Sequence, residues 1–399
     1  MVALLTKVVR AVSIVFSTIT IPFGVACQGD SNDQEAAATP DVPTVIGNPV
    51  WISSERADVP LSQITGMAVD AKQRVYAPDY RESAVFVFGA DGTYLTRIGR
   101  KGSGPGEFER GCCAAFDPNE RLWVKDAGNA RYVVFNISGA DATVVAKPAF
   151  VVPLPHQDPN WGPRLWIDTR NNVISIGHVT DPDRPTLRSV KHFFADTTGR
   201  VVQTIAEPTQ TEDVTKPIEY TVGDRLKSTT LLLYQPFGAR ELRANGPDGA
   251  FALAGSGKYS VRWFSPTGEL LHTITQELVG PELSLIDRAV GDSSLANIAR
   301  NANTTVGLLP FKLPERKPPL YAIFFDEDRR LWVQHTTLQG MVQQADVYGP
   351  NGALVFRAAW PAGIRIATDG YVRGNTAWGL QLDDNDVPHV VRMEFTSGR

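Results

Sequence analysis

The sequence predicts an all-β protein, a six-bladed β-propeller with four antiparallel strands in each blade. Three observations predict this fold. A two-strand pattern with Asp or Asn at its turn recurs along the chain, a second two-strand pattern with Gly at its turn follows each copy, and an apolar N-terminal segment can supply the last strand. A supersecondary unit that repeats along a chain is typical of propellers. The composition, with 43% hydrophobic and 21% charged residues, is that of a globular domain.

In the first pattern an apolar residue precedes Asp or Asn, and a short polar turn leads into an apolar strand. An aromatic or aliphatic residue lies six positions after each Asp or Asn, as Trp123 does after Asp117. The side chains of Asp and Asn suit such turns because they accept hydrogen bonds from the backbone two residues on. The five turn residues are Asp70, Asp117, Asp168, Asn245 and Asp326.

In the second pattern an apolar strand ends in an aromatic residue, and a Gly-containing turn leads to another strand. Glycine supplies the positive φ that such hairpin turns need. The five turn glycines are Gly92, Gly139, Gly199, Gly268 and Gly352. Each pair of patterns gives four antiparallel strands, which make one blade.

The sixth blade is predicted within residues 363–395, where the sequence offers too few strands for a complete blade. The apolar segment Val45–Ser53 is expected to supply the missing strand and close the ring, which removes open sheet edges. The propeller is therefore assigned to residues 45–399.

One segment departs from the strand patterns and predicts a short helical insertion between blades four and five. Apolar residues recur at helical spacing within residues 281–302, which predicts one amphipathic helix, or two if Asp292-Ser293-Ser294 interrupt it. We expect the insertion to pack on the rim of the propeller rather than to cover the channel. The apolar positions are Leu283, Ile286, Ala289, Val290, Leu295, Ile298 and Ala299.

Residues 1–26 are predicted to be a signal peptide, because a positively charged start precedes an apolar stretch too short to span a bilayer. Its end and the next residue, Gly24-Val25-Ala26-Cys27, resemble a bacterial lipobox, although Gly24 stands where Leu is usual. The resemblance implies that Cys27 carries a lipid that anchors the protein to a membrane; ordinary signal cleavage is the alternative. Residues 27–44 are poor in apolar side chains, which predicts a disordered tether. Gln28 in place of Asp favours the outer membrane of a two-membrane cell, with the protein facing the periplasm.

The loop Gly102-Ser103-Gly104-Pro105-Gly106-Glu107-Phe108 resembles the inter-blade loop of NHL-repeat propellers, which typically reads Gly-x-Gly-Pro-Gly-x-Phe. The segment Asp126-Ala127-Gly128-Asn129-Ala130-Arg131 is similar to the Asp-x-x-Asn-x-Arg segment of that family. Asp79 keeps the matching place in the first blade, without the Asn and Arg. The full signature covers roughly a quarter of the chain, so the resemblance implies the fold and carries no activity.

Three arginines, Arg110, Arg164 and Arg240, lie just before the inner strands of three consecutive blades. Guanidinium groups bind carboxylate or phosphate in bidentate fashion, so we expect the three to converge at the mouth of the channel and bind a small anionic ligand. The alternative is pairing with neighbouring acids such as Glu241. The candidate ligand-binding residues are Arg110, Cys112, Cys113, Arg164, Arg240 and Glu241.

Cys112 and Cys113 are the only cysteines besides Cys27, so disulfides are not the main stabiliser of the fold. The adjacent pair can form a strained disulfide that faces the channel, or remain two thiols on opposite faces of a strand. Strand alternation favours the second arrangement.

We therefore expect an exported, lipid-anchored protein of the cell envelope that acts as a binding or interaction module for a protein, a glycan or a small anionic ligand. Common catalytic motifs are missing, which leaves an enzymatic role undecided and favours a non-enzymatic one. The net charge of −4 gives no reason to expect a nucleic acid partner.

Two alternatives stay open: a structural scaffold, and a metal-dependent hydrolase or lyase with its site in the central channel. Some six-bladed propellers that resemble this sequence hold a divalent metal there through Glu, Asn and Asp. The oxygen ligands available here, such as Glu241 and Asp126, do not form a recognisable set. No cofactor is expected, although a divalent metal in the channel stays open.

Overall fold

A computed structural model provides the structure of the protein, and its described residues lie within Asp41–Arg399. The predicted signal peptide, the lipidation site Cys27 and most of the tether lie outside the described residues. The described residues are 42–53, 59, 61–140, 143–154, 164–180, 188–208, 213–223, 228–309, 311–367 and 369–397.

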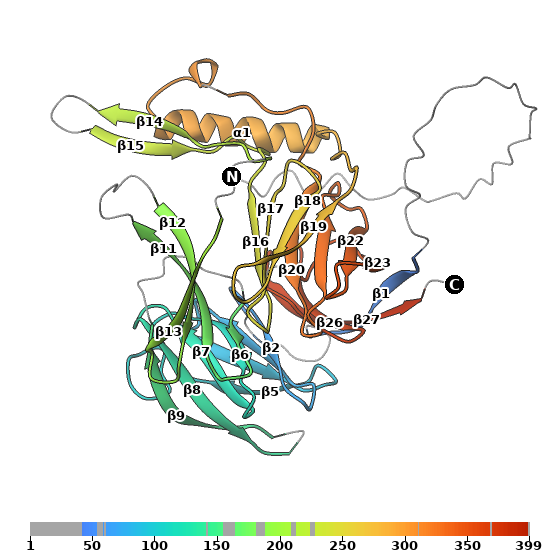
Figure 1. Ribbon diagram of the computed structural model, residues 1–399. Coiled ribbons are helices and arrows are strands. Elements are labelled where there is room, and N and C mark those ends of the chain that lie inside the picture. Colours follow the sequence, from blue (N-terminus) through green and yellow to red (C-terminus); the bar gives the residue numbers. More distant parts are fainter. Residues whose placement is uncertain are drawn as a thin grey trace, which may run out of the picture. The chain divides into compact units, whose positions relative to one another are not determined.

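Four sheets of four antiparallel strands follow one another along the chain (Figure 1). The first contains β2 (Ala68–Val69), β3 (Val75–Asp79), β4 (Ala84–Phe88) and β5 (Tyr94–Ile98). The second contains β6 (Gly111–Phe116), β7 (Arg121–Asp126), β8 (Arg131–Ser138) and β9 (Val145–Pro153). The third contains β10 (Trp166–Ile167), β11 (Val173–Thr180), β12 (Arg188–Ala195) and β13 (Val201–Ala206). The fourth contains β16 (Glu241–Asn245), β17 (Phe251–Gly255), β18 (Ser260–Phe264) and β19 (Leu270–Thr275).

The remaining large sheet has nine strands and includes both ends of the described chain. It begins with β20 (Leu320–Phe325), β21 (Leu331–His335), β22 (Gln343–Tyr348) and β23 (Leu354–Trp360). It continues with β1 (Thr44–Ile52), β27 (Pro388–Ser397), β26 (Thr376–Leu382) and β24 (Ile364–Arg365), and β25 (Tyr371–Arg373) also pairs with β26. The antiparallel pairing of β1 with β27 confirms that the N-terminal strand completes the last strand set (Figure 1). A short parallel pairing of β1 with β23, which the sequence does not predict, joins two four-strand sets into one sheet.

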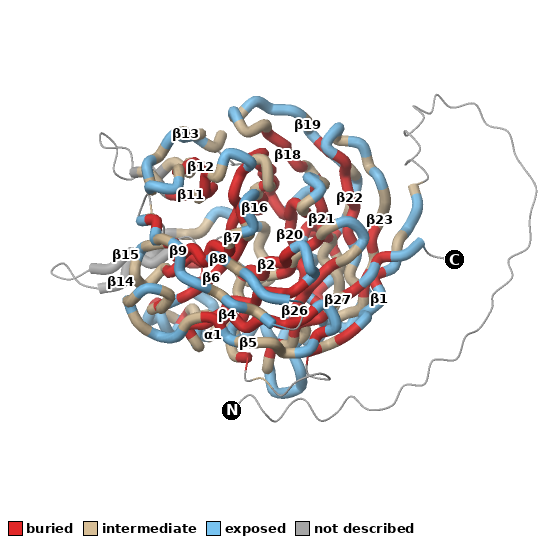
Figure 2. The backbone as a smooth tube through the Cα atoms, turned by 90° about the horizontal axis from the view of Figure 1, so that it is seen from below, coloured by how far each residue is buried: buried red, intermediate tan, exposed pale blue. Residues whose placement is uncertain are grey.

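The sheets pack against one another around a closed ring, so the described unit is propeller-like. Nearly all of its regular elements are strands, so its fold class is all-β. Tyr76 of the first sheet shares a core cluster with Leu122 of the second, and Trp166 of the third shares one with Trp263 of the fourth. The ring closes because Trp378 of the nine-stranded sheet packs in one cluster with the first sheet. Figure 2 shows the buried segments along these strands.

The recurring Asp turn owes its spacing to a shared carboxylate. Asp326 accepts hydrogen bonds from the backbone nitrogen of Arg330 at 2.8 Å, from Arg330 Nε at 2.6 Å and from Trp332 Nε1 at 2.8 Å. Asp117 accepts the same three bonds from Arg121 and Trp123. The aromatic residue six positions after the Asp recurs because its polar edge is satisfied by the turn itself.

The glycine-rich loop between the first two sheets is held by the second sheet. Arg131 donates hydrogen bonds to the backbone oxygens of Ser103, Gly104 and Glu107 at 3.0–3.1 Å. Its Nε also pairs with Asp126 at 3.2 Å. The Asp-x-x-Asn-x-Arg segment therefore fixes the preceding loop against its blade.

The helical insertion is a single helix, α1 (Leu285–Asn301), between β19 and β20 as predicted, and Asp292-Ser293-Ser294 do not interrupt it. A capping box of Ser284 and Asp287 begins the helix. A short 3-10 turn, η2 (Val306–Leu308), follows it, and a hairpin of β14 (Ile218–Gly223) and β15 (Ser228–Leu233) precedes the fourth sheet.

The predicted apolar face of the helix is partly wrong, because Ile286 and Val290 are 59% and 55% exposed. A Cβ at Gly291 would meet Leu313, so this small residue lets the loop chain approach the helix closely. The Asp287 carboxylate forms an ion pair of 2.7 Å with Lys317. Because of these contacts, the buried face of the helix is formed by residues spaced four apart: Asp287, Gly291, Leu295 and Ala299.

Candidate functional site

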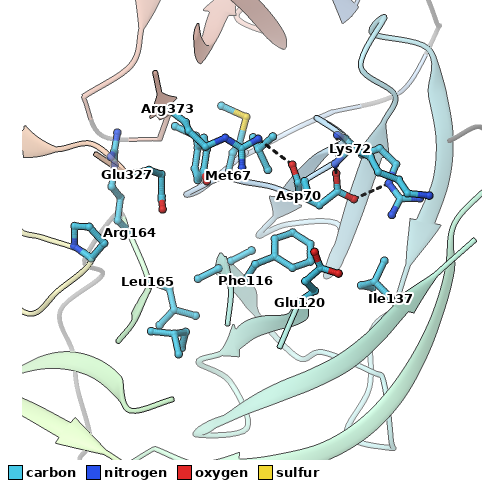
Figure 3. A pocket seen from close by; sticks show the side chains of 18 of the residues that line it. Met67, Asp70, Lys72, Phe116, Glu120, Ile137, Arg164, Leu165, Glu327 and Arg373 are labelled. Atoms are coloured by element: carbon cyan, nitrogen blue, oxygen red, sulfur yellow. Dashed lines mark hydrogen bonds and ion pairs between the residues drawn. The ribbon is translucent and has the colours of Figure 1, made fainter. Parts of the chain in front are cut away.

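Inner strands and their turns from several sheets line one cavity of about 500 Å³, which we call the channel cavity (Figure 3). Its wall includes Ala114 of β6, Trp166 of β10 and Tyr371 of β25. A second cavity of about 270 Å³, which we call the side cavity, is lined among others by Cys113, Lys125 and Phe324. Arg164, Leu165 and Trp166 line both.

Arg164 is fixed across the channel by partners from the nine-stranded sheet. Its guanidinium donates hydrogen bonds to the backbone oxygen of Phe325 and, at 3.1 Å, to that of Ile366. It also lies over the ring of Phe324, 4.9 Å from the centroid. Burial lowers the pKa of Arg164 to about 10, so the group stays charged at neutral pH. Its Nε is buried and has no hydrogen-bond partner among the described residues.

Glu327 lies beside Arg164 at one side of the cavity, whereas Asp70 and Lys72 lie at the other (Figure 3). Burial raises the pKa of the Glu327 carboxyl to about 7, against the opposing effect of the cations Arg164 and Arg373. The Tyr371 phenol is hydrogen-bonded to Glu327. Glu327 therefore titrates near neutrality, and its pKa is affected by the charge of the fixed arginine.

At the opposite side of the cavity, charged side chains pair with one another and donate hydrogen bonds to backbone oxygens. Asp70 pairs with Arg74 Nε at 2.6 Å, and Arg373 donates to the backbone oxygen of Asp70 at 2.9 Å. Lys72 Nζ donates to the backbone oxygen of Gly139 at 3.0 Å. The charged residues of the cavity wall are Asp70, Lys72, Arg74, Glu120, Arg164, Glu327 and Arg373. Four cations thus face three carboxyls, and protonation of Glu327 adds to the positive excess.

The three predicted arginines do not share one cavity. Arg110 donates to the hydroxyl of Tyr80 at 3.4 Å and is exposed. Arg240 donates to the backbone oxygen of Tyr321 at 3.0 Å and lines a different cavity of about 430 Å³. Only Arg164 of the three lines the channel cavity.

The spacing to the turn residue explains why Arg164 and Arg240 differ. Arg164 lies four residues before Asp168, and Arg240 lies five residues before Asn245. Successive side chains of an extended segment point to opposite faces, so an even and an odd offset send two arginines in different directions. Glu241 accepts a hydrogen bond of 2.5 Å from Arg243 rather than pairing with Arg240.

The cysteines lie where the strand pattern breaks. Both are buried in β6, and they are not joined by a disulfide. The β6–β7 register shifts between Cys112 and Ala114, and Cys113 has a φ of 49°. Their thiols are hydrogen-bonded to each other, so they do not point to opposite faces as strand alternation predicts.

The residues of the channel cavity that sequence reasoning missed include Trp166, Glu327, Tyr371 and Arg373. Glu327 directly follows the turn residue Asp326, in a place that reads as an ordinary polar turn. Tyr371 and Arg373 belong to the last strand set, which lacks the Asp turn that marks inner strands elsewhere. Their proximity depends on ring closure, which a local pattern does not encode.

Two further findings concern the described part of the chain. It contains no group of three or more His, Cys, Asp or Glu side chains placed to hold a metal ion. It also has no helix that is long and apolar enough to cross a membrane.

Residues 56–151 match a family model described as a 6-bladed beta-propeller. With the strand pairing above, this match identifies the chain as a β-propeller protein. Its solved structural neighbours include a Bacteroides fragilis protein that is described as exported. The two chains are 12% identical, with a TM-score of 0.45 and coverage of 90% of this chain and 98% of that one. Regucalcin, a calcium-binding protein from Agrobacterium tumefaciens, has 11% identity, a TM-score of 0.41 and coverage of 90% and 97%. Virginiamycin B lyase from Staphylococcus aureus has 11% identity, a TM-score of 0.37 and coverage of 83% and 94%. No curated protein matches the chain.

Proposed function

We propose that the protein is a binding module of the cell envelope that holds a small anionic ligand in the channel cavity. The observation that carries this proposal is the buried Nε of Arg164, a charged donor without a partner among the described residues. A buried donor left unsatisfied costs free energy, and an anion that accepts its hydrogen bond recovers that cost. The cavity volume of about 500 Å³ lies within the range of small-molecule sites.

The cavity wall favours a ligand with an acidic group and an apolar part. Arg164 is fixed by two backbone oxygens and an aromatic ring, so it offers its remaining donor without losing rotamer freedom on binding. Trp166 and Phe116 provide apolar surface in the same cavity. A small carboxylate with a hydrocarbon or ring portion fits this combination.

The test is a calorimetric titration of the purified protein with a panel of small mono- and dicarboxylates, each also offered as its uncharged amide. We expect at least one acid to bind and its amide to bind about tenfold or more weakly, because a charged acceptor contributes the larger hydrogen-bond energy. Arg164→Gln should reduce affinity to a similar extent, and Arg240→Gln is the matched control that should not. Equal affinity of the wild type and Arg164→Gln would refute the site. Binding of glycans or a protein, without any acid, would replace the proposed ligand class.

The cellular setting of this proposal is an exported protein anchored through a lipid on Cys27. The apolar segment before Cys27 and the polar residues after it support the anchor. Metabolic labelling with a fatty-acid analogue should tag the wild type and not Cys27→Ser. Equal labelling of both would refute lipidation and leave the ligand site untouched.

We also propose that the nine-stranded sheet represents two blades, so that the ring has six blades of an NHL-like type. The parallel β1–β23 pairing involves only three residue pairs, whereas β1 and β27 pair along nearly all of β1. The Gly-rich loop and the Arg131 segment that holds it support the NHL-like assignment. An experimental structure with another number of blades would overturn it.

A further inference from the structure

We propose that Cys112 and Cys113 form a reversible disulfide between adjacent residues in the wall of the side cavity. This proposal is independent of anion binding. It starts from the local backbone, which places two neighbouring thiols in contact where a regular strand would separate them.

The contact results from a bulge in β6. In a regular strand, neighbouring side chains point to opposite faces and cannot bond. Here the register shifts between Cys112 and Ala114, and Cys113 adopts a left-handed φ of 49°. A bulge of this kind redirects the side chain of the extra residue. The two thiols consequently lie within hydrogen-bond contact of each other.

The neighbouring sheet holds the bulge in place. The backbone nitrogen of Cys113 donates to the oxygen of Thr65 at 3.1 Å, and that of Ala114 donates to the oxygen of Gly66 at 3.1 Å. A left-handed conformation is unfavourable for a residue with a side chain, so it persists where surrounding contacts impose it. These two bonds to the segment just before β2 of the first sheet are such contacts, and the thiol pair is therefore a fixed feature of the fold.

The surroundings of the pair assign different roles to the two sulfurs. Both residues are buried, and Cys113 lines the side cavity together with Lys125 and Tyr132. The hydrogen bond with Cys112, together with burial, raises the pKa of the Cys113 thiol, and Asp369 acts in the same direction while Lys125 opposes it. Cys113 lines the side cavity and Cys112 does not, so Cys113 is the sulfur that an oxidant in the cavity reaches first.

The reaction is a thiol–disulfide exchange with a small or protein disulfide as the oxidant. The Cys113 thiolate attacks one sulfur of the oxidant and releases the other as a thiol. Cys112 then loses its proton and attacks the Cys113 sulfur, which forms the internal disulfide and releases the second thiol. The protein thus gives up two electrons and two protons, and the oxidant becomes two thiols. The expected exported location supplies oxidants of this class.

The product should be easily reduced. Adjacent Cα atoms lie about 3.8 Å apart, whereas ordinary disulfides span about 4.4–6.8 Å. A strained disulfide has a higher reduction potential and belongs to the labile, regulatory kind rather than the structural kind. The alternative is that both residues act only as small buried apolar side chains.

The test uses the full chain with Cys27→Ser, which leaves Cys112 and Cys113 as its two cysteines. The folded protein is incubated with oxidised glutathione, quenched in acid, unfolded, alkylated and analysed by mass spectrometry. We expect both alkylatable thiols to be lost together, in a peptide that lacks two hydrogens and carries no glutathione. Reduced glutathione should restore both. Two alkylated cysteines after incubation, or glutathione retained on one of them, would overturn the proposal.

A variant separates the roles of the two sulfurs. Cys112→Ser in the same background should accumulate glutathione on Cys113 and form no internal disulfide. Absence of that adduct in a folded Cys112→Ser protein would contradict Cys113 as the attacking sulfur. The experiment on the wild-type pair does not depend on this variant, so a folding defect in it leaves the proposal testable.

Discussion

Arg164 donates a hydrogen bond of 3.1 Å to the backbone oxygen of Ile366, which lies 202 positions further along the chain. The bond joins the entry of the third sheet to the last strand set across the channel. A second bond, to the backbone oxygen of Phe325, fixes the same guanidinium from another direction. Arg164 therefore connects distant parts of the ring, while its buried Nε has no hydrogen-bond partner among the described residues.

The pH dependence of anion binding should follow Glu327. Its pKa is raised to about 7 by burial, and the charged groups around it are Arg164, Arg373 and Asp326, with the Tyr371 phenol also in contact. Protonation of Glu327 removes a negative charge beside Arg164, so anion affinity should be highest below about pH 7 and fall as the pH rises through that value. Titration calorimetry across this range measures the effect, and Glu327→Gln should abolish it. An unchanged pH profile in Glu327→Gln would contradict the assignment.

The same carboxyl should reduce stability at alkaline pH. Because the folded-state pKa of Glu327 lies above the ordinary value of 4.5, the folded protein binds the proton more tightly than the unfolded chain. Its favourable contribution is complete below pH 4.5 and is lost as the pH rises through about 7. Glu327→Gln should therefore raise the free energy of unfolding above pH 7 by up to about 3 kcal/mol and have little effect near pH 4. Denaturant unfolding at both pH values provides the measurement; a loss of stability at high pH would be the contrary result.

Asp326 should be essential to its turn. Its carboxylate satisfies the backbone and Nε of Arg330 and the Nε1 of buried Trp332. Asp326→Ala removes the partner of Arg330 Nε and of the Trp332 indole, although Arg330 keeps its ion pair with Asp328, and it should cost about 3 kcal/mol of unfolding free energy. The matched control is Asp196→Ala, because Asp196 pairs with Arg200 in the same way but the Arg200 side chain is 77% exposed. Similar losses in thermal and denaturant unfolding of the two variants would contradict this account of the turn.

The closing strand β1 should contribute through its buried face. Trp51 is 3% exposed, donates to the backbone oxygen of Ala90 at 2.9 Å and packs on Gly92. Trp51→Ala should reduce the free energy of unfolding by about 3–5 kcal/mol. Its neighbour Val50 is 45% exposed, so Val50→Ala should change stability by less than about 0.5 kcal/mol. Equal effects of the two substitutions on urea unfolding would show that β1 does not close the ring through this contact.

The fold was predictable because the residues that define its repeat are close together in the sequence and interact with one another. The turn Asp, the cation or amide that follows it and the aromatic six positions on all meet within one hairpin, as Asp117, Arg121 and Trp123 do. The closing role of Val45–Ser53 was predictable from the missing strand. The exposed positions of Ile286 and Val290 were not, because the inward face of α1 depends on Gly291 and on the ion pair of Asp287 with a distant lysine.

The site was only partly predictable. Arg164 and Cys113 emerged from their places before or at the start of inner strands; both line the side cavity, and Arg164 also lines the channel cavity. Glu327 and Tyr371 reach Arg164 only when strand sets far apart in the sequence come together around the channel. Local sequence patterns therefore do not predict that these residues lie near Arg164. The bulge at Cys113 also depends on hydrogen bonds to the preceding sheet.

The central claim is that the channel cavity beside Arg164 binds a small anion. The most direct measurement is a crystal structure of the protein with the tightest-binding acid from the titration panel. The account predicts the acid in the channel cavity, with one oxygen about 3 Å from Arg164 Nε and its apolar part toward Trp166. An acid bound in the cavity beside Arg240, with the channel cavity empty, would contradict the claim.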